Sequence, residues 1–238
     1  MAKQKAKRVV EKKVKQVSRG FSDLKTDILS MGKMVEGMVK KAIQGMVEQK
    51  NSFAKQVIDE DQKVDQFEIQ IDNFCIDLFS RGTARRAPTL TPHEIRSVAC
   101  GMKIVADLER IGDLAVDISQ MVLELNQQPA LKPYVTLPKM TDIVERMVED
   151  SLRSYVKEEA TRAYQVIRRQ EEIEGYSRDV FNELVEFMSR DIFSIYRSTR
   201  LLGITRYLER IGAHAANIAE MVVLMVKGED IRHQHGRM

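Results

Sequence analysis

The sequence predicts an all-α protein made of two tandem three-helix bundles, with six helices in all. Apolar residues recur at helical spacing almost throughout the 238 residues, and no stretch alternates as a β-strand would. The segment LERIG occurs at residues 108–112 and again at residues 208–212. The 19-residue stretches that contain it share 10 identical positions, where unrelated segments of average composition would share about one. The chain therefore contains an internal repeat.

The first half begins with two expected helices. The first covers about residues 21–50 and has an apolar side along its whole length. Asn51 and Ser52 interrupt this pattern, and the hydroxyl of Ser52 suits the N-cap of a second helix that runs to about residue 81. The stretch RGTARRAPTLTP follows, and its glycine and two prolines are typical of a loop.

The third helix has a clear start signal. Thr91 suits the N-cap, Pro92 suits the first helical position, and Glu94 is the expected capping-box partner. The apolar pattern continues to about residue 128 and includes the first LERIG.

The second half repeats this plan after the proline-rich stretch QQPALKPYVTLP. Three further helices are expected, over about residues 139–158, 159–189 and 192–227, and the last carries the second LERIG. The predicted organisation is a basic extension (1–20), repeat 1 (21–128), a linker (129–138), repeat 2 (139–228) and a C-terminal tail (229–238).

The net charge of +3 conceals an uneven distribution. Residues 1–19 hold eight Lys or Arg and one acid, which leaves 30 basic against 34 acidic residues in the remainder. The body of the protein is therefore slightly acidic, which argues against a nucleic-acid partner.

The basic N-terminal segment carries an apolar stripe. Val10, Val14, Val17 and Phe21 are spaced by 4, 3 and 4 residues. A helix of this kind over residues 1–20 can lie on anionic lipid, where each Lys or Arg adds about 1 kcal/mol. The alternative is a solvated leader without a membrane role.

The rest of the composition indicates a cytoplasmic protein. No uncharged apolar run reaches 18 residues, and the N-terminus lacks the apolar core of a signal peptide. The two cysteines, Cys75 and Cys100, lie within apolar helical pattern and are interpreted as reduced core thiols. If the N-terminal segment binds lipid, the protein would sit at the inner face of the membrane.

Pairs of acidic residues mark a candidate site in the first half. Glu109 and Asp113 stand four apart on the third expected helix, and Asp61 and Asp65 stand four apart on the second. Residues at this spacing share one helix face. Glu68 and Asp117 extend the two faces and are weaker candidates. Because adjacent residues do not face one another, the Arg110 side chain is expected to point away from the pair that flanks it.

Carboxylates that converge from neighbouring helices suit Mg, Ca, Mn or Fe, and di-iron bundles are built in this way. The alternative is a solvated acidic face without a ligand, because such pairs also occur by accident in helices of this charge density.

The second repeat has fewer acids in the equivalent places. Gln170 aligns with Asp61, and Glu174 aligns with Asp65. The second LERIG keeps its glutamate, but Ala213 replaces the aspartate. The weaker candidates here are Glu171, Glu174 and Glu209. His214, which follows the alanine, is interpreted as a packed or hydrogen-bonded histidine.

These motifs resemble the PhoU family of bacterial phosphate-uptake regulators. DLERIGDLAVDI and YLERIGAHAANIAEMV are similar to its two signature helices, and FSDLKTDILSMG is similar to its opening helix. VIDEDQKVDQFE is similar to its D-x-x-x-D helix. RRAPTLTPHEIR resembles the family's R-Q-P…D-L-R loop, although it is two residues longer and has Glu94 for the aspartate. The resemblance covers about residues 21–228, in the expected order.

The resemblance implies a two-repeat, six-helix fold, a homodimer, and a multinuclear metal cluster. Iron is the first expectation, with Zn, Mn, Mg and Ca as alternatives. The implied ligands are Asp61, Asp65, Glu109 and Asp113; in repeat 2 only Glu174 and Glu209 stay in place.

The implied role is regulatory. A protein of this family links the ATPase subunit of a phosphate ABC transporter to a sensor histidine kinase, restrains the phosphate-starvation response and limits uptake. One alternative is a PhoU-like accessory of another phosphate permease or ion channel. Another is a carboxylate-metal hydrolase, against which stands the lack of a Glu-x-x-His pair or a nucleophile constellation around any of the four histidines.

Overall fold

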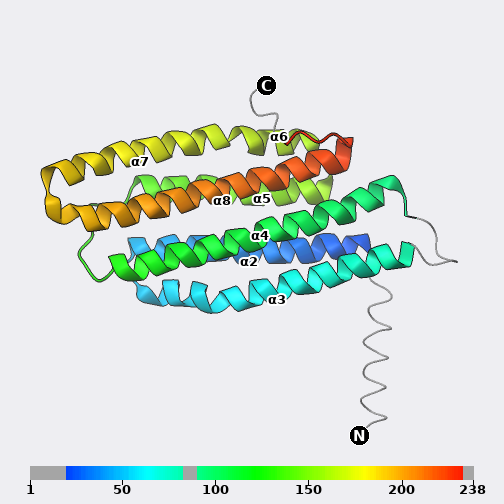
Figure 1. Ribbon diagram of the computed structural model, residues 1–238, viewed down its shortest axis with the longest axis horizontal. Helices are drawn as coiled ribbons and strands as arrows, with labels where there is room; N and C mark the ends of the chain where they lie inside the picture. The colour runs from blue at the N-terminus through cyan, green and yellow to red at the C-terminus, as the bar shows by residue number, and fades with distance from the viewer. Residues whose placement is uncertain (1–19, 83–89, 233–238) are drawn as a thin grey trace, which may run out of the picture.

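The computed structural model describes residues 20–82 and 90–232, and all regular structure in them is helical (Figure 1). The helices are α2 (Phe21–Val47), α3 (Asn51–Gly82), α4 (Pro92–Leu125), α5 (Thr136–Lys157), α6 (Ala160–Arg168), α7 (Gln170–Arg190) and α8 (Ile195–Lys227), with a 3₁₀ turn η1 (Ile192–Ser194) before α8. Each half contains three helical segments, since α6 and α7 together occupy the place of one. The all-α fold with an internal repeat is confirmed. None of the described helices is long and apolar enough to cross a membrane.

The two halves form bundles that pack side by side (Figure 1). Helices α2, α3 and α4 contact one another in the first bundle, and α5 to α8 do so in the second. The bundles meet along two helix pairs, α4 with α8 and α2 with α5. One continuous core of buried apolar side chains runs through both bundles, so neither repeat presents its whole apolar face to water.

Glycine allows close approach at both helix pairs between the bundles. A Cβ on Gly32 of α2 would lie 2.0 Å from Leu152 Cδ1 of α5, and a Cβ on Gly203 of α8 would lie 2.7 Å from Met121 Sδ of α4. Distances this short leave no room for a larger side chain. These contacts help to fix how the two repeats sit against each other.

The start of α4 forms as the sequence predicts. Thr91 Oγ1 accepts a hydrogen bond from the Glu94 backbone N–H at 3.2 Å, and Glu94 Oε2 accepts one from the Thr91 N–H at 2.7 Å. Pro92 is the first helical residue. This reciprocal arrangement satisfies two backbone donors that would otherwise lack partners.

The turn between α2 and α3 differs slightly from the prediction. Helix α2 ends at Val47, three residues early, because Gln49 adopts a left-handed conformation (φ 51°). Helix α3 starts at Asn51, so Ser52 lies inside it rather than at its N-cap. The Asn126 side chain, at the end of α4, donates to Asn51 Oδ1 at 2.9 Å, which ties this turn to α4.

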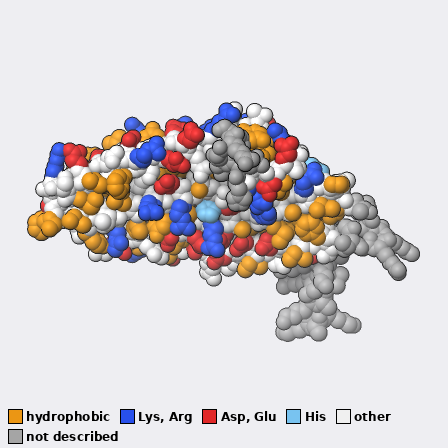
Figure 2. All heavy atoms as spheres, turned by 45° about the horizontal axis from the view of Figure 1, so that its top comes forward, with side chains coloured by type: hydrophobic (Ala, Val, Ile, Leu, Met, Phe, Trp, Pro, Cys, Tyr) orange, Lys and Arg blue, Asp and Glu red, His pale blue; other side chains and the backbone are white. Residues whose placement is uncertain are grey.

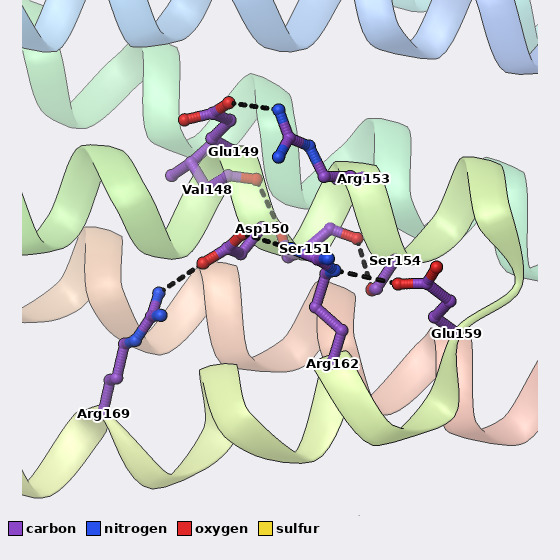
Figure 3. A network of polar contacts seen from close by, with 9 residues as sticks. All are labelled: Val148, Glu149, Asp150, Ser151, Arg153, Ser154, Glu159, Arg162 and Arg169. Atoms are coloured by element: carbon purple, nitrogen blue, oxygen red, sulfur yellow. Dashed lines mark hydrogen bonds and ion pairs between the residues drawn. The ribbon is translucent and has the colours of Figure 1, made fainter.

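The continuous helix predicted over residues 159–189 is wrong, because the helix is interrupted at Arg169. Arg169 Nη1 donates to Asp150 Oδ2 of α5 at 2.6 Å, and Arg162 of α6 donates to the other oxygen at 3.0 Å (Figure 3). Val166 and Ile173, both buried, keep a seven-residue spacing across the break. The apolar pattern therefore could not reveal the interruption.

Candidate functional site

The glycine of LERIG sets an equivalent contact in each bundle. A Cβ on Gly112 of α4 would lie 3.3 Å from Val64 of α3, and a Cβ on Gly212 of α8 would lie 2.6 Å from Ile173 of α7. Val64 and Ile173 thus occupy matching places in the two repeats. The register confirms the sequence alignment, which pairs Asp61 with Gln170 and Asp65 with Glu174.

The four main acidic candidates lie on one face of α3 and α4. Asp61 Oδ1 would be 3.9 Å from a Cβ on Gly112, so this carboxylate faces the turn between Glu109 and Asp113. Partial burial raises the pKa of Asp61, and the charges of Asp65 and Asp113 raise it further. The charges of Asp65 and Asp113 therefore make Asp61 harder to ionise.

Two further acids on α3, Glu68 and Asp72, extend this surface. Together with Asp61, Asp65, Glu109 and Asp113 they form what we call the carboxylate face. Burial raises the pKa of Glu109, and Asp113, Glu68 and Asp65 add to the rise. Burial also raises the pKa of Glu68, with Asp72 as the next cause. Asp72 was missed by the sequence analysis, although it stands four residues beyond Glu68 and so extends the same stripe.

Asp117 lies at the edge of the carboxylate face. It is half-buried one turn beyond Asp113 and is not among the charges that raise the pKa of Asp61, Glu68 or Glu109. The structure thus sets Asp117 apart from the other candidates of the first bundle.

The prediction that Arg110 points away from the acidic pair is wrong. Its Nη1 donates to Asp113 Oδ2 at 2.9 Å, and its Nε lies 3.5 Å from Glu109 Oε2. The Cβ of Arg110 does diverge from both neighbours, but the long side chain carries the guanidinium back to them. Arg110 lowers the pKa of Glu109 and so opposes the surrounding carboxylates.

The carboxylates of this face are suitable ligands for a hard cation, but they do not lie close enough together to bind one. Carboxylate oxygens are the ligands that Mg²⁺, Ca²⁺, Mn²⁺ and iron accept. Within residues 20–82 and 90–232, however, no three Asp, Glu, His or Cys side chains are grouped closely enough to hold a metal ion. Binding would require the carboxylates to turn toward one point and Arg110 to release Asp113. The metal site remains a prediction.

The equivalent face of the second bundle is less acidic. Ser177 stands where the first bundle has Glu68 and donates to Glu209 Oε2 at 3.2 Å. Glu174 lies 4.0 Å from the guanidinium of Arg178, and Glu171 is exposed. A hydroxyl thus stands where the first bundle has an acid, and a guanidinium lies beside Glu174, so this face is a poorer match for a cation.

His214 is a contact between the bundles. Its Nδ1 lies 2.8 Å from Asp107 Oδ1 of α4, and Asn217 donates to the same oxygen at 3.3 Å. The interpretation of His214 as a hydrogen-bonded histidine agrees with this geometry. His93 lies 3.2 Å from Glu158 instead, so each of these two histidines faces a carboxylate outside the carboxylate face.

A second acidic cluster lies between α2 and α5. Glu36 of α2 and Asp142, Glu145 and Glu149 of α5 line a cavity of about 300 Å³ together with Arg146. Burial raises the pKa of Glu36 to about 7, with further contributions from Glu149 and Glu145 and an opposing one from Lys33. Asp142, Glu145 and Glu149 stand three and four residues apart and share one face of α5, but the sequence analysis missed the cluster because Glu36 comes from the other repeat.

Comparison with known proteins finds the same domain in both repeats. The PhoU domain matches residues 28–122 and 137–222. The chain is 30% identical over 211 residues to the phosphate-specific transport system accessory protein PhoU homolog of Clostridium acetobutylicum, which covers 89% of this chain and 94% of that protein.

Two crystal structures share the fold. PhoU from Pseudomonas aeruginosa has a TM-score of 0.80 at 29% identity and covers 87% of this chain and 97% of its own. The phosphate transport system regulatory protein PhoU from Streptococcus pneumoniae has a TM-score of 0.79 at 26% identity, with 88% and 96% covered.

Proposed function

Because the chain belongs to the PhoU domain family, we propose that it is a non-catalytic regulator of phosphate transport. It would restrain phosphate uptake and the phosphate-starvation response by linking the ATPase subunit of a phosphate ABC transporter to a sensor histidine kinase. The observation that carries this proposal is the match of both repeats, in order, to the family. The relative from Clostridium, named as an accessory protein of phosphate-specific transport, supports the transport role.

The two-bundle architecture suits this kind of output. Helices α3 and α7 lie on the outer sides of the bundles (Figure 1) and present long solvated faces. A regulator without chemistry of its own acts by binding one state of a partner more tightly than another. Its removal therefore frees the partner rather than abolishing a reaction.

Metal binding is the second part of the proposal. Asp61, Asp65, Glu109 and Asp113 would hold the cation, with iron as the first expectation and Zn, Mn, Mg and Ca as alternatives. A bound cation would supply positive charge that relieves the mutual repulsion of the carboxylate face. Support comes from the raised pKa values of Asp61 and Glu109, to which burial contributes most and the charges of neighbouring carboxylates add.

We further propose that the protein is a homodimer in the cytoplasm. Residues 1–20 would contact the inner surface of the membrane. Residues 1–19 lie outside the described part of the chain, so this proposal depends on their sequence alone. Sedimentation with anionic vesicles tests it: removal of residues 2–19 should abolish binding, and unchanged binding would exclude the anchor.

Deletion of the gene tests the regulatory role. We expect phosphate-starvation genes to stay on in phosphate-rich medium, with excess phosphate taken up, and the cloned gene to restore repression. Normal repression in the deletion strain would contradict the proposal and favour an accessory of another phosphate permease or ion channel. Phosphoesterase activity of the metal-loaded protein would instead favour a carboxylate-metal hydrolase.

A further inference from the structure

A groove of about 400 Å³ runs between α7 and α8 on the second bundle. Its walls include Phe181 and Arg178 on α7, and Leu202 and Arg206 on α8. Most of its exposed lining is apolar. The Phe181 side chain is 53% exposed, an unusual degree for a phenylalanine in a described helix of this chain. The groove thus offers an apolar surface, and each of its two walls carries one guanidinium group.

The apolar surface continues from the groove toward the end of α7. Val185 stands one turn beyond Phe181 and is 41% exposed, and Ile192 of η1 is 72% exposed. Ile195 at the start of α8 is 41% exposed. Figure 2 shows hydrophobic side chains gathered at the left end of the molecule, where α7 turns into α8. The stretch of α7 from Arg178 to Val185 is about 10 Å long at 1.5 Å per residue, which matches about two turns of a docked helix.

Basic residues outnumber acidic residues along the groove, with Arg178 and Arg206 against Glu209. Arg206 is exposed, and the structure shows no ion pair between it and any carboxylate of residues 20–82 or 90–232. Arg178 lies 4.0 Å from Glu174, with both side chains more than half exposed, so water screens that pair. Glu209 is the acid of the lining, and Ser177 donates to it. Both guanidinium groups are therefore available to form an ion pair with a carboxylate of another molecule.

The first bundle has opposite chemistry at the matching positions. In the register set by Gly112 and Gly212, Ile69 matches Arg178, Asp72 matches Phe181 and Ala106 matches Arg206. The first bundle thus places an acid where the second has its exposed phenylalanine. The two copies of one structural unit expose different surfaces, and the arginine-bordered groove belongs to the second copy.

We propose that this groove binds an acidic amphipathic helix of a partner protein. Apolar side chains of that helix would lie against Phe181 and Leu202, while its flanking carboxylates would meet Arg178 and Arg206. Helix-in-groove recognition of this kind depends on apolar side chains at spacings of three and four residues. The inference rests on the proposed function in one respect, that the protein acts by contact with other proteins.

Fluorescence anisotropy with the full chain tests the proposal. The probe is a labelled peptide of about 15 residues with Leu at spacings of 4, 3 and 4, a few Glu that flank them and Ala elsewhere; a second probe has Lys in place of each Glu. We expect Arg178→Glu/Arg206→Glu to weaken binding of the Glu peptide about tenfold or more and to strengthen binding of the Lys peptide. Phe181→Ala, which removes the apolar contact without adding a charge, should weaken both.

A matched control is Lys55→Glu/Lys63→Glu, which reverses two exposed charges on α3 and should leave binding unchanged. All these positions are exposed, and circular dichroism checks that each variant is folded. Failure of the Glu peptide to bind, equal binding of both peptides, or indifference to the groove variants would overturn the proposal.

Two other occupants give different results. If the groove variants halve the mass in sedimentation velocity, the occupant is a second copy of this chain. If they abolish binding to anionic vesicles while no peptide binds, the occupant is a lipid surface. Either result overturns the partner-helix proposal. None of these outcomes bears on the deletion phenotype, so a failure here is distinct from a failure of the regulatory role.

Discussion

Arg110 and Asp113 form an ion pair at the border of the carboxylate face, with 2.9 Å between Nη1 and Oδ2. The same guanidinium lies 3.5 Å from Glu109. Like charges four residues apart disfavour a helix unless a positive charge compensates them. Arg110 supplies that charge, so a cation that bound at the proposed site would compete with Arg110 for the same two carboxylates.

We expect Arg110→Gln to tighten binding of Mn²⁺ about two- to fivefold, because an exposed ion pair of this kind contributes about 0.2–1 kcal/mol that the cation no longer has to displace. Titration calorimetry measures the change. Arg210→Gln is the matched control, since Arg210 holds the same place in the second LERIG, where Ala213 replaces the aspartate. Equal or weaker binding by Arg110→Gln would show that the arginine does not compete with the metal.

The four main carboxylates should account for most of the bound metal. Asp65→Ala combined with Glu109→Ala is expected to remove most iron or manganese while the helical circular dichroism stays intact, because Asp65 is exposed, Glu109 is partly buried, and neither belongs to the apolar core. Elemental analysis of protein purified without a chelator or a His tag gives the metal content.

The comparison is with Glu174→Ala/Glu209→Ala at the matching positions of the second repeat. That variant should retain more metal, because Ser177 stands there in place of Glu68 and Arg178 lies beside Glu174. Full metal content in the first double variant would show that the carboxylate face is not the site.

The fold could be predicted from the sequence because its signals are local. Apolar spacing marks each helix, and the start of α4 needs only Thr91, Pro92 and Glu94. The acidic stripe on α3 and α4 was also within reach, because the four-residue spacing fixes which side chains share a face. Asp72, which continues the stripe beyond Glu68, was overlooked although its spacing was readable. The side-chain path of Arg110 could not be predicted, since backbone spacing does not determine where a long side chain ends.

Features that depend on contacts between different helices could not be predicted in this way. The cavity beside Glu36 needs acids from α2 and α5, which are more than 100 residues apart. Arg169 interrupts a helix while it contacts Asp150 on another helix, and the apolar pattern on either side is unaffected. Both depend on tertiary packing, which a helical period does not contain.

Glu36 should make the protein less stable as the pH rises. Its pKa is raised from 4.5 to about 7, so between these values the folded state holds a proton that the unfolded state has lost. Stability attributable to Glu36 is complete below about pH 4.5, falls as the pH rises toward 7, and stays low above it. The shift sets an upper limit of about 3 kcal/mol.

Glu36→Gln removes this dependence. We expect it to raise the free energy of unfolding by about 1–3 kcal/mol at pH 8, roughly 2–4 °C in Tm for each kcal/mol, and to have little effect near pH 4. Thermal melts across this pH range provide the measurement, and Glu172→Gln, at an exposed position on α7, serves as the comparison. A constant difference between Glu36→Gln and the parent at every pH would contradict the assignment.

The packing of α2 against α5 can be tested with two glycines of the same helix. A Cβ on Gly32 would lie 2.0 Å from Leu152 Cδ1, whereas a Cβ on Gly37 would meet nothing within 4 Å. Gly37→Ala should stabilise the protein by about 0.5–1 kcal/mol through helix propensity alone. Gly32→Ala should instead destabilise it by about 1–3 kcal/mol, because Leu152 is buried and cannot move aside freely.

Denaturant unfolding of both variants gives the two free energies, and a third variant isolates the cause. If the collision with Leu152 is responsible, Gly32→Ala should be less harmful in a Leu152→Ala background, because the smaller side chain leaves room for the new methyl group. Should Gly32→Ala stabilise the chain as Gly37→Ala does, α2 and α5 would not be packed together in solution. The two bundles would then be joined through α4 and α8 without the second helix pair.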